Sequence, residues 1–167
     1  MPELFNAHGW KIVLEEATLP DGRVKQVARA ERADTVHLLA TPNTGKILLL
    51  REFRPYYQTY VWMLPGGRAD KEPDLHEAAQ RELREETGLR AETLQHLWTA
   101  SPSESINYSN HFFHATGLMP DPLPQDSDEL MEVHTLGIEE AIDRVLTSPK
   151  VHLASAFALL RWLRGKV

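Results

Sequence analysis

The residues best suited to chemistry are three glutamates, Glu82, Glu85 and Glu86, in the segment RELREETGL at residues 81–89. Because a helix turns by about 100° per residue, it would place all three within one narrow sector of its surface. Like charges at these spacings repel by roughly 0.2–0.5 kcal/mol per pair. A sequence that keeps them beside the glycine pair Gly66-Gly67 therefore indicates a site for cations. Hard oxygen ligands suit Mg²⁺ or Mn²⁺ rather than zinc.

A second interpretation needs no site. A solvated helix could carry the same glutamates in ion pairs with Arg81, which has Glu77 four residues before it and Glu85 four residues after it. The glycine pair before the helix and Gly88 at its end favour the cation site.

The segment from Gly67 to Leu89 resembles the Nudix box, a pattern of Gly, five residues, Glu, seven residues and then Arg-Glu-apolar-any-Glu-Glu-any-Gly-apolar. The matching positions are Gly67, Arg81, Glu82, Leu83, Glu85, Glu86, Gly88 and Leu89. One position departs from the pattern, because Pro73 stands where the first Glu belongs. In the family this Glu braces the box Arg, and either Glu72 or Glu77 could brace Arg81 instead.

The resemblance implies roles for the box residues. Glu82 and Glu86 would be the principal metal ligands, Glu85 an auxiliary ligand, and Gly66 would offer its carbonyl oxygen. Arg81 would be part of the catalytic machinery. The general base would come from the loop at residues 101–108, where Glu104 is the acid, or from Glu82 itself, with Glu129 and Glu132 as further candidates.

Three arginines are candidates for binding phosphate. Arg51 and Arg54 bracket Phe53 near the end of a predicted strand, and Arg68 follows the glycine pair. Each could instead form an ordinary surface ion pair or lie exposed to solvent. Trp62 is the candidate for stacking on a nucleobase, although aromatic residues beside strands more often lie in a core or an interface.

The composition sets limits on the class of protein. With 167 residues, 42% hydrophobic and 25% charged, the chain suits one domain, residues 1–167, that buries roughly 68–70% of its unfolded surface. The net charge of -6 argues against nucleic-acid binding but not against a nucleotide substrate held through cations. The absence of cysteine excludes disulfides and thiolate sites. With no membrane span and no signal peptide in the sequence, we expect a cytoplasmic protein.

The predicted elements combine strands and helices without regular alternation, which favours an α+β fold. A hairpin is predicted over residues 10–17 and 24–31, around the turn Leu19-Pro20-Asp21-Gly22. Further predicted strands cover residues 35–40, 46–51, 60–64, 93–100, 110–116 and 131–136. Helices are predicted from about Pro73 to Thr87, with Asp74 as its cap, and over residues 138–147 and 151–164. The last would bury Leu153, Ala156, Phe157, Leu160 and Leu163.

Three further segments, LPDGR at 19–23, ILLLREFRP at 47–55 and LASAFALLRWL at 153–163, are similar to the branch of the family that hydrolyses ADP-ribose and nucleoside-diphosphate sugars. That resemblance implies the Nudix α/β/α sandwich with a mixed β-sheet. It also implies an N-terminal hairpin region, residues 1–33, that crosses to a partner in a homodimer, and a catalytic core at residues 34–167.

The function implied is metal-dependent hydrolysis of the diphosphate linkage in ADP-ribose or another nucleoside-diphosphate sugar, giving a nucleoside monophosphate and a sugar phosphate. One alternative is a Nudix hydrolase of dinucleoside polyphosphates, nucleoside triphosphates or RNA 5′ ends. Another is a non-catalytic nucleotide-sugar-binding module, motivated by Pro73 and by Asn107 in the loop after the box.

Overall fold

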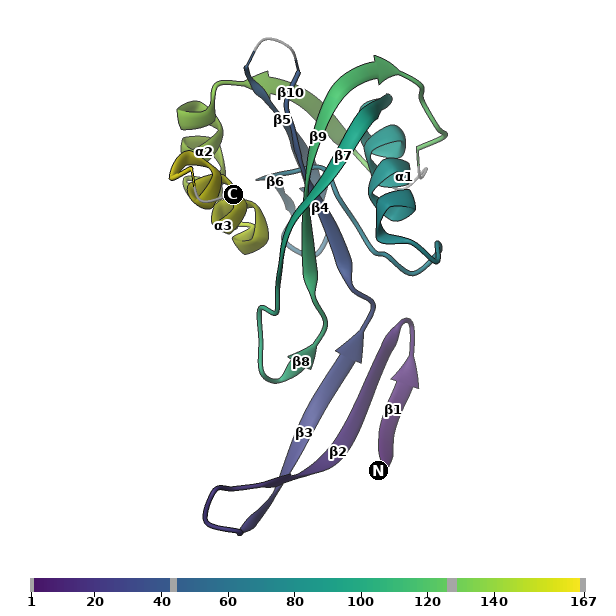
Figure 1. Ribbon diagram of the computed structural model, residues 1–167, viewed down its shortest axis with the longest axis vertical. Coiled ribbons are helices and arrows are strands. Elements are labelled where there is room, and N and C mark those ends of the chain that lie inside the picture. Colours follow the sequence, from purple (N-terminus) through teal and green to yellow (C-terminus); the bar gives the residue numbers. More distant parts are fainter. Residues whose placement is uncertain (1, 43–44, 126–128, 166–167) are drawn as a thin grey trace.

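The computed structural model describes residues 2–42, 45–125 and 129–165. The N-terminal strands form an arm that extends away from the rest of the molecule (Figure 1). The arm is a sheet with the order β1-β2-β3-β8. Its strands are β1 (Glu3–Ala7), β2 (Trp10–Thr18), β3 (Val24–Arg32) and β8 (Ile106–Asn107).

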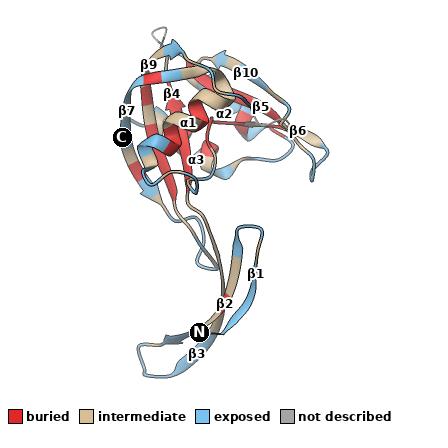
Figure 2. Cartoon of the chain, turned by 90° about the vertical axis from the view of Figure 1, so that its right-hand side faces the viewer, coloured by how far each residue is buried: buried red, intermediate tan, exposed pale blue. Residues whose placement is uncertain are grey.

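The predicted hairpin is confirmed, because β2 and β3 pair antiparallel from Trp10 opposite Arg32 to Thr18 opposite Val24. Strand β1, which was not predicted, extends the hairpin at its outer edge. Most of the arm is exposed to solvent (Figure 2), including the large apolar side chains of Leu4, Phe5 and Val24.

Two three-stranded sheets form the centre of the molecule. One has the order β4-β9-β7 and is mixed, because β4 runs parallel to β9 while β7 runs antiparallel to it. The other has the order β10-β5-β6 and is antiparallel. The strands are β4 (Thr35–Ala40), β5 (Ile47–Arg54), β6 (Thr59–Met63), β7 (Leu89–Ala100), β9 (Asn110–Pro120) and β10 (Met131–Leu136).

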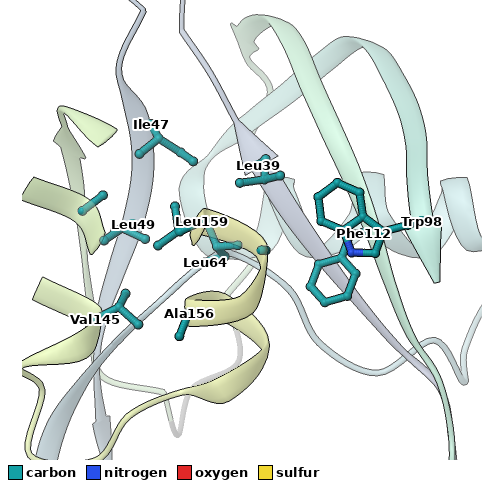
Figure 3. Close-up of a cluster of buried hydrophobic side chains, with 11 residues drawn as sticks. Leu39, Ile47, Leu49, Leu64, Trp98, Phe112, Val145, Ala156 and Leu159 are labelled. Carbon is teal, nitrogen blue, oxygen red and sulfur yellow. The ribbon is translucent and has the colours of Figure 1, made fainter. Parts of the chain in front are cut away.

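The helices lie on both sides of these strands, with α1 (Leu75–Thr87) on one side and α2 (Ile138–Leu146) and α3 (Leu153–Leu163) on the other (Figure 1). Alternate residues of β4 pack on opposite faces of the strand, toward α1 or toward α3. Val36 and Leu38 belong to a buried cluster with Ala79 and Leu83 of α1. Leu39 belongs to the opposite cluster (Figure 3), with Leu159 of α3. The predicted α/β/α sandwich with a mixed sheet is therefore confirmed.

Helix α1 is bounded by caps at both ends. Asp74 is the N-cap, and its side chain accepts a hydrogen bond from the backbone N–H of His76 at 2.9 Å. Gly88 ends the helix in the left-handed conformation, with φ at 72°. The helix thus begins two residues later than the predicted start at Pro73, because Asp74 stands outside it as the cap.

The predicted inward face of α3 is wrong except for Ala156. Leu153 is 77% exposed and Phe157 42%, and Leu160 and Leu163 are exposed as well. The helix instead buries Ser155, Ala156, Ala158 and Leu159. The cause is a tertiary hydrogen bond, since the Ser155 hydroxyl accepts from the backbone N–H of Leu64 at 2.8 Å and turns this side of the helix inward.

No helix among the described residues combines the length and the apolar character that a bilayer crossing requires.

Candidate functional site

The glycine pair of the box brings the backbone close to both β4 and α1. Gly66 has φ at +149°, and a Cβ atom there would overlap the carbonyl oxygen of Val36. A Cβ atom at Gly67 would overlap the carboxylate of Glu82. The backbone N–H of Gly66 donates to Oε2 of Glu86 at 2.7 Å. Glycine is therefore needed at both positions for the loop to lie against the glutamates of the helix.

Arg81 ties the box loop to the helix. Its guanidinium donates to Glu72, to Oε2 of Glu85 at 2.6 Å and to Oε1 of Glu82 at 2.8 Å. It also donates to the carbonyl oxygen of Arg68 at 3.0 Å. Burial opposes the charge, but the hydrogen bond to Glu72 and the charges of Glu82 and Glu85 raise the pKa of Arg81.

The departure at Pro73 is compensated by the residue before it. Of the two candidates to brace Arg81, the structure selects Glu72, whose side chain is 18% exposed. Glu77 is exposed and is not among the described residues that pair with Arg81. The acid that holds the box arginine is therefore present, one position early.

Two carboxylates of the box, those of buried Glu82 and partly buried Glu86, act on each other electrostatically. Burial raises the pKa of Glu82 to about 7, and the nearby charge of Arg81 opposes this rise. Burial and the negative charge of Glu82 raise the pKa of Glu86 well above its ordinary value, opposed by the N–H of Gly66. Negative charge on this pair is therefore costly unless a cation lies beside it.

A divalent cation fits these residues chemically, since they offer hard oxygen ligands and would be stabilised by positive charge. Within the described ranges, no group of three or more His, Asp or Glu side chains is already arranged as a metal cage. Arg81 occupies one oxygen each of Glu82 and Glu85.

A cleft of about 800 Å³ opens over these glutamates. It brings together most of the residues predicted for the site: Arg54, Gly66, Arg68, Arg81, Glu82, Glu85 and Glu86. Glu129, one of the further candidates for the general base, also lines it. Arg51, Trp62, Glu104 and Glu132 are not among the described residues that line this cleft.

Arg54 enters the cleft beside an acid that the sequence did not single out. Its guanidinium forms an ion pair with Glu52 at 2.7 Å. Glu52 is only 5% exposed, and burial raises its pKa, opposed by Arg54 and assisted by the charge of Glu129. Because Glu52 and Arg54 are two residues apart on β5, strand alternation places both on the same face. Both residues line the same cleft as the glutamates of the box.

Arg51 on β5 and its partner Trp62 on β6 do not line the cleft, and Trp62 packs against the buried cluster that includes Leu159. Arg51 donates to both carboxylate oxygens of Glu132 at 3.1 Å and lies 3.9 Å from the ring centre of Tyr60. Trp62 contacts the ring of His134, with 4.7 Å between ring centres. Both side chains thus have partners away from the cleft.

Glu104 lies in a separate cavity of about 320 Å³, with Arg29, Ser103 and Asn107. Pro102 and Tyr108 from the same loop do line the main cleft. The loop therefore borders the site, while the carboxylate of Glu104 belongs to the smaller cavity.

Sequence reasoning missed several residues that the cleft collects from distant segments: Arg32, Thr35, His37, Asn110, Lys150 and His152. One signal was present, because His37 is surrounded by apolar residues in the strand segment TVHLLA at residues 35–40. Burial, followed by the nearby His152, lowers the pKa of His37 to about 3. Burial, followed by Arg54, lowers the pKa of His152 to about 4. Both imidazoles are therefore neutral.

Comparison with known proteins agrees with this geometry. The family model described as NUDIX domain matches residues 31–162. An ADP-ribose pyrophosphatase of Bacillus subtilis (strain 168) is 26% identical over 167 residues, covering 98% of this chain and 90% of that protein. An ADP-ribose pyrophosphatase of Mycobacterium tuberculosis (strain ATCC 25618 / H37Rv) is 33% identical over 138 residues, covering 79% of this chain and 66% of that protein.

A solved structure described as an ADP compounds hydrolase superposes with a TM-score of 0.77 at 22% identity, covering 99% of this chain and 92% of that one, which supports the fold. The resemblance to Nudix hydrolases, and among them to ADP-ribose pyrophosphatases, is confirmed by these matches. The chain belongs to the NUDIX domain family.

Proposed function

We propose that this Nudix pyrophosphatase hydrolyses the diphosphate linkage of ADP-ribose or another nucleoside-diphosphate sugar, releasing a nucleoside monophosphate and a sugar phosphate. The observation that carries the proposal is a cleft lined both by the glutamates Glu82 and Glu86, whose pKa values are raised, and by cationic Arg54. Two relatives with ADP-ribose pyrophosphatase in their names support this substrate class.

Glu82 and Glu86, with Glu85 and the carbonyl of Gly66, would hold Mg²⁺ or Mn²⁺. When bound, such an ion neutralises phosphate charge and lowers the pKa of a water molecule. Arg81 positions Glu82 and Glu85 through its hydrogen bonds.

Arg54 and Arg68 bind phosphate oxygens from the cleft wall. Of the candidates for the general base, Glu82 and Glu129 line the cleft. Glu104 remains a candidate only if its loop turns the carboxylate toward the substrate. The cytoplasmic location stays a prediction from the sequence.

The N-terminal hairpin region predicted from the sequence, residues 1–33, is proposed to join two copies of the chain. Its exposed Leu4 and Phe5 support this, because a two-sided exposed sheet gains stability by covering such side chains. Light scattering on the wild type and on Phe5→Asp tests the proposal. A dimer that becomes a monomer supports it, and a wild-type monomer contradicts it.

The activity is tested by incubating the protein with ADP-ribose, other nucleoside-diphosphate sugars, dinucleoside polyphosphates and nucleoside triphosphates, each with Mg²⁺, Mn²⁺ or a chelator. We expect sugar phosphate as a product, dependence on the ion, and loss of turnover in Glu86→Gln. Glu77→Gln, which changes an exposed acid of the same helix, is the control. Preference for triphosphates would refute the substrate class. Binding of nucleotide sugars without turnover would identify a binding module.

A further inference from the structure

Arg32 lies where the arm meets the cleft. It is the last residue of β3, and its half-buried side chain lines the cleft. The strands on either side of β3 bring aromatic residues to it. Trp10 of β2 stands opposite Arg32 in the sheet register, and Tyr108 directly follows β8, which pairs with β3 on the other side. The order of the strands in the arm therefore sets the surroundings of Arg32.

Both aromatic rings contact the guanidinium of Arg32. Its Cζ atom lies 5.1 Å from the ring centre of Trp10 and 4.9 Å from that of Tyr108, within the range of cation–π contacts. Since Tyr108 itself lines the cleft, the charged end of Arg32 lies at the cleft wall. Stacking uses the faces of the planar guanidinium, and its N–H groups, which lie in the plane, remain able to donate.

The charge of Arg32 is not neutralised by a carboxylate within the described parts of the chain. The other arginines that line the cleft each form an ion pair with an acid: Arg54, Arg68 and Arg81. An anion at Arg54 has to share the guanidinium with Glu52, which lies 2.7 Å away. An anion at Arg32 displaces no such partner, so the attraction is available in full.

This charge acts inside the cleft. His37 is buried and lines the cleft. Its pKa is lowered by burial and by His152, and the positive charge of Arg32 adds to that effect while a hydrogen bond to Asn110 opposes it. A place that disfavours a second positive charge favours an anion.

The same turn of the arm also reaches the loop of the box. A Cβ atom at Gly9 would lie 3.4 Å from Nη1 of Arg68. Gly9 and Trp10 are consecutive, so the turn between β1 and β2 lies against one arginine of the cleft and its first strand residue stacks on another. The arm therefore belongs to the wall of the cleft in its own chain.

We propose that Arg32 binds phosphate oxygens of the substrate, with Trp10 and Tyr108 holding its guanidinium in place. The inference rests on the proposed function, since the anion is the diphosphate of the same substrate. A guanidinium can donate two parallel N–H groups to two phosphate oxygens. Trp10 is a positioning residue, because it is not among the described residues that line the cleft and acts through Arg32.

The test measures binding without turnover. Titration calorimetry in saturating Mg²⁺ uses two ligands, inorganic pyrophosphate and an ADP-ribose analogue with methylene in place of the bridging oxygen of the diphosphate. The proteins are the wild type, Arg32→Gln, Arg32→Lys, Trp10→Leu and Trp10→Phe. The control is Arg29→Gln, which removes the same charge from the same strand. Arg29 pairs with Glu15 at 3.4 Å and is not among the described residues that line the main cleft.

We expect Arg32→Gln to raise the Kd for both ligands roughly tenfold, because hydrogen bonds from a charged donor are lost. Arg32→Lys should restore part of the affinity, since lysine keeps the charge without the planar fork. Trp10→Leu should raise the Kd roughly two- to fivefold, and Trp10→Phe less. Arg29→Gln should bind like the wild type.

Three results would overturn the proposal. They are an Arg32→Gln protein that binds both ligands like the wild type, an equal loss of affinity in Arg29→Gln, and a wild type that binds neither ligand. An equal loss in Arg29→Gln would mean that net charge alone governs binding.

Nitrogen-15 NMR of the Nε–H group of Arg32 separates binding from a purely structural role. The signal is assigned by its absence in Arg32→Lys, and the measurement is made on the wild type, so it does not depend on whether Arg32→Gln folds. Saturating pyrophosphate should shift the signal. An arginine that only joins the arm to the core would keep its signal unchanged, and that result rejects the proposal.

The same readout separates this inference from the proposed function. Turnover of nucleoside-diphosphate sugars with an unchanged signal from Arg32 supports the proposed function and rejects the role of Arg32. A shifted signal and a weakened Arg32→Gln in a protein that hydrolyses none of these sugars supports the role of Arg32 in binding phosphate and rejects the proposed function.

Discussion

The raised pKa of Glu82 makes the stability of the metal-free protein depend on pH in a direction opposite to that of most ion-paired acids. The perturbation is Glu82→Gln, which keeps the shape of the side chain and removes its charge. The carboxylate is 11% exposed, and burial is the main cause of its raised pKa. The amide should therefore be tolerated, even though Arg81 would then donate to a neutral amide oxygen instead of a carboxylate oxygen.

The magnitude follows from the two pKa values. The difference between 4.5, the ordinary value, and about 7 in the folded protein corresponds to about 3 kcal/mol, since one pKa unit is about 1.4 kcal/mol. Below pH 4.5 the acid is protonated in both states and costs nothing. Between pH 4.5 and about 7 the unfolded chain loses its proton first, so stability falls as pH rises. Above that range the full cost remains.

The assay is urea unfolding in a chelator at pH 4 to 8.5. The free energy of unfolding of Glu82→Gln should exceed that of the wild type by an amount that grows by about 3 kcal/mol from pH 4 to pH 8. Glu77→Gln, on the exposed side of the same helix, should follow the wild type. Saturating Mg²⁺ should reverse the order at pH 8, because only the wild type keeps both of the proposed ligands, Glu82 and Glu86. Parallel curves for Glu82→Gln and the wild type would refute the reasoning.

Three other variants test single contacts. Glu72→Gln should lower the free energy of unfolding by about 2 kcal/mol, because it removes a charged partner from a mostly buried guanidinium; a loss no larger than that of an exposed glutamate would contradict this. Gly67→Ala should lower kcat on the order of 100-fold, because the new Cβ overlaps the carboxylate of Glu82; a normal kcat would mean that the loop yields. Ser155→Ala should lower the free energy of unfolding, measured by thermal unfolding, by about 2 kcal/mol, because the N–H of Leu64 loses its acceptor. Ser148→Ala should lower it less, because the hydrogen bond that Ser148 accepts from the N–H of Trp62 is 3.4 Å long.

The parts of the fold that could be predicted are those with local causes. The hairpin around Pro20 and Gly22 and the helix capped by Asp74 and Gly88 are set by residues next to one another in sequence. The inward face of α3 could not be predicted, because both of its faces carry large apolar residues. A hydrogen bond from the backbone N–H of Leu64, directly after β6 and distant in sequence, fixes which one is buried.

The site shows the same division. The side formed by the box glutamates was predicted because one loop and one helix carry Gly66, Glu82 and Glu86 in a fixed spacing. The other residues of the cleft were not predicted. His37 and Glu52 come from separate strands, β4 and β5, and no local sequence pattern reveals how these strands are ordered in the sheets. For Arg51 and Arg54 the sequence supplied two candidates, and only strand alternation in the folded sheet separates the one in the cleft from the one outside it.

The position of Glu72 has an evolutionary consequence. Since an acid at residue 72 reaches Arg81, an ancestral chain with glutamates at both 72 and 73 would have held this arginine in two ways. The glutamate at 73 could then be replaced by proline without passing through an intermediate whose arginine lacked its partner. By such a neutral path a family can lose one residue of its sequence motif and still keep the ion pair that this residue formed. Searches that demand the acid at one fixed distance from Gly67 would pass over such descendants, whereas a search that allows either position would retain them.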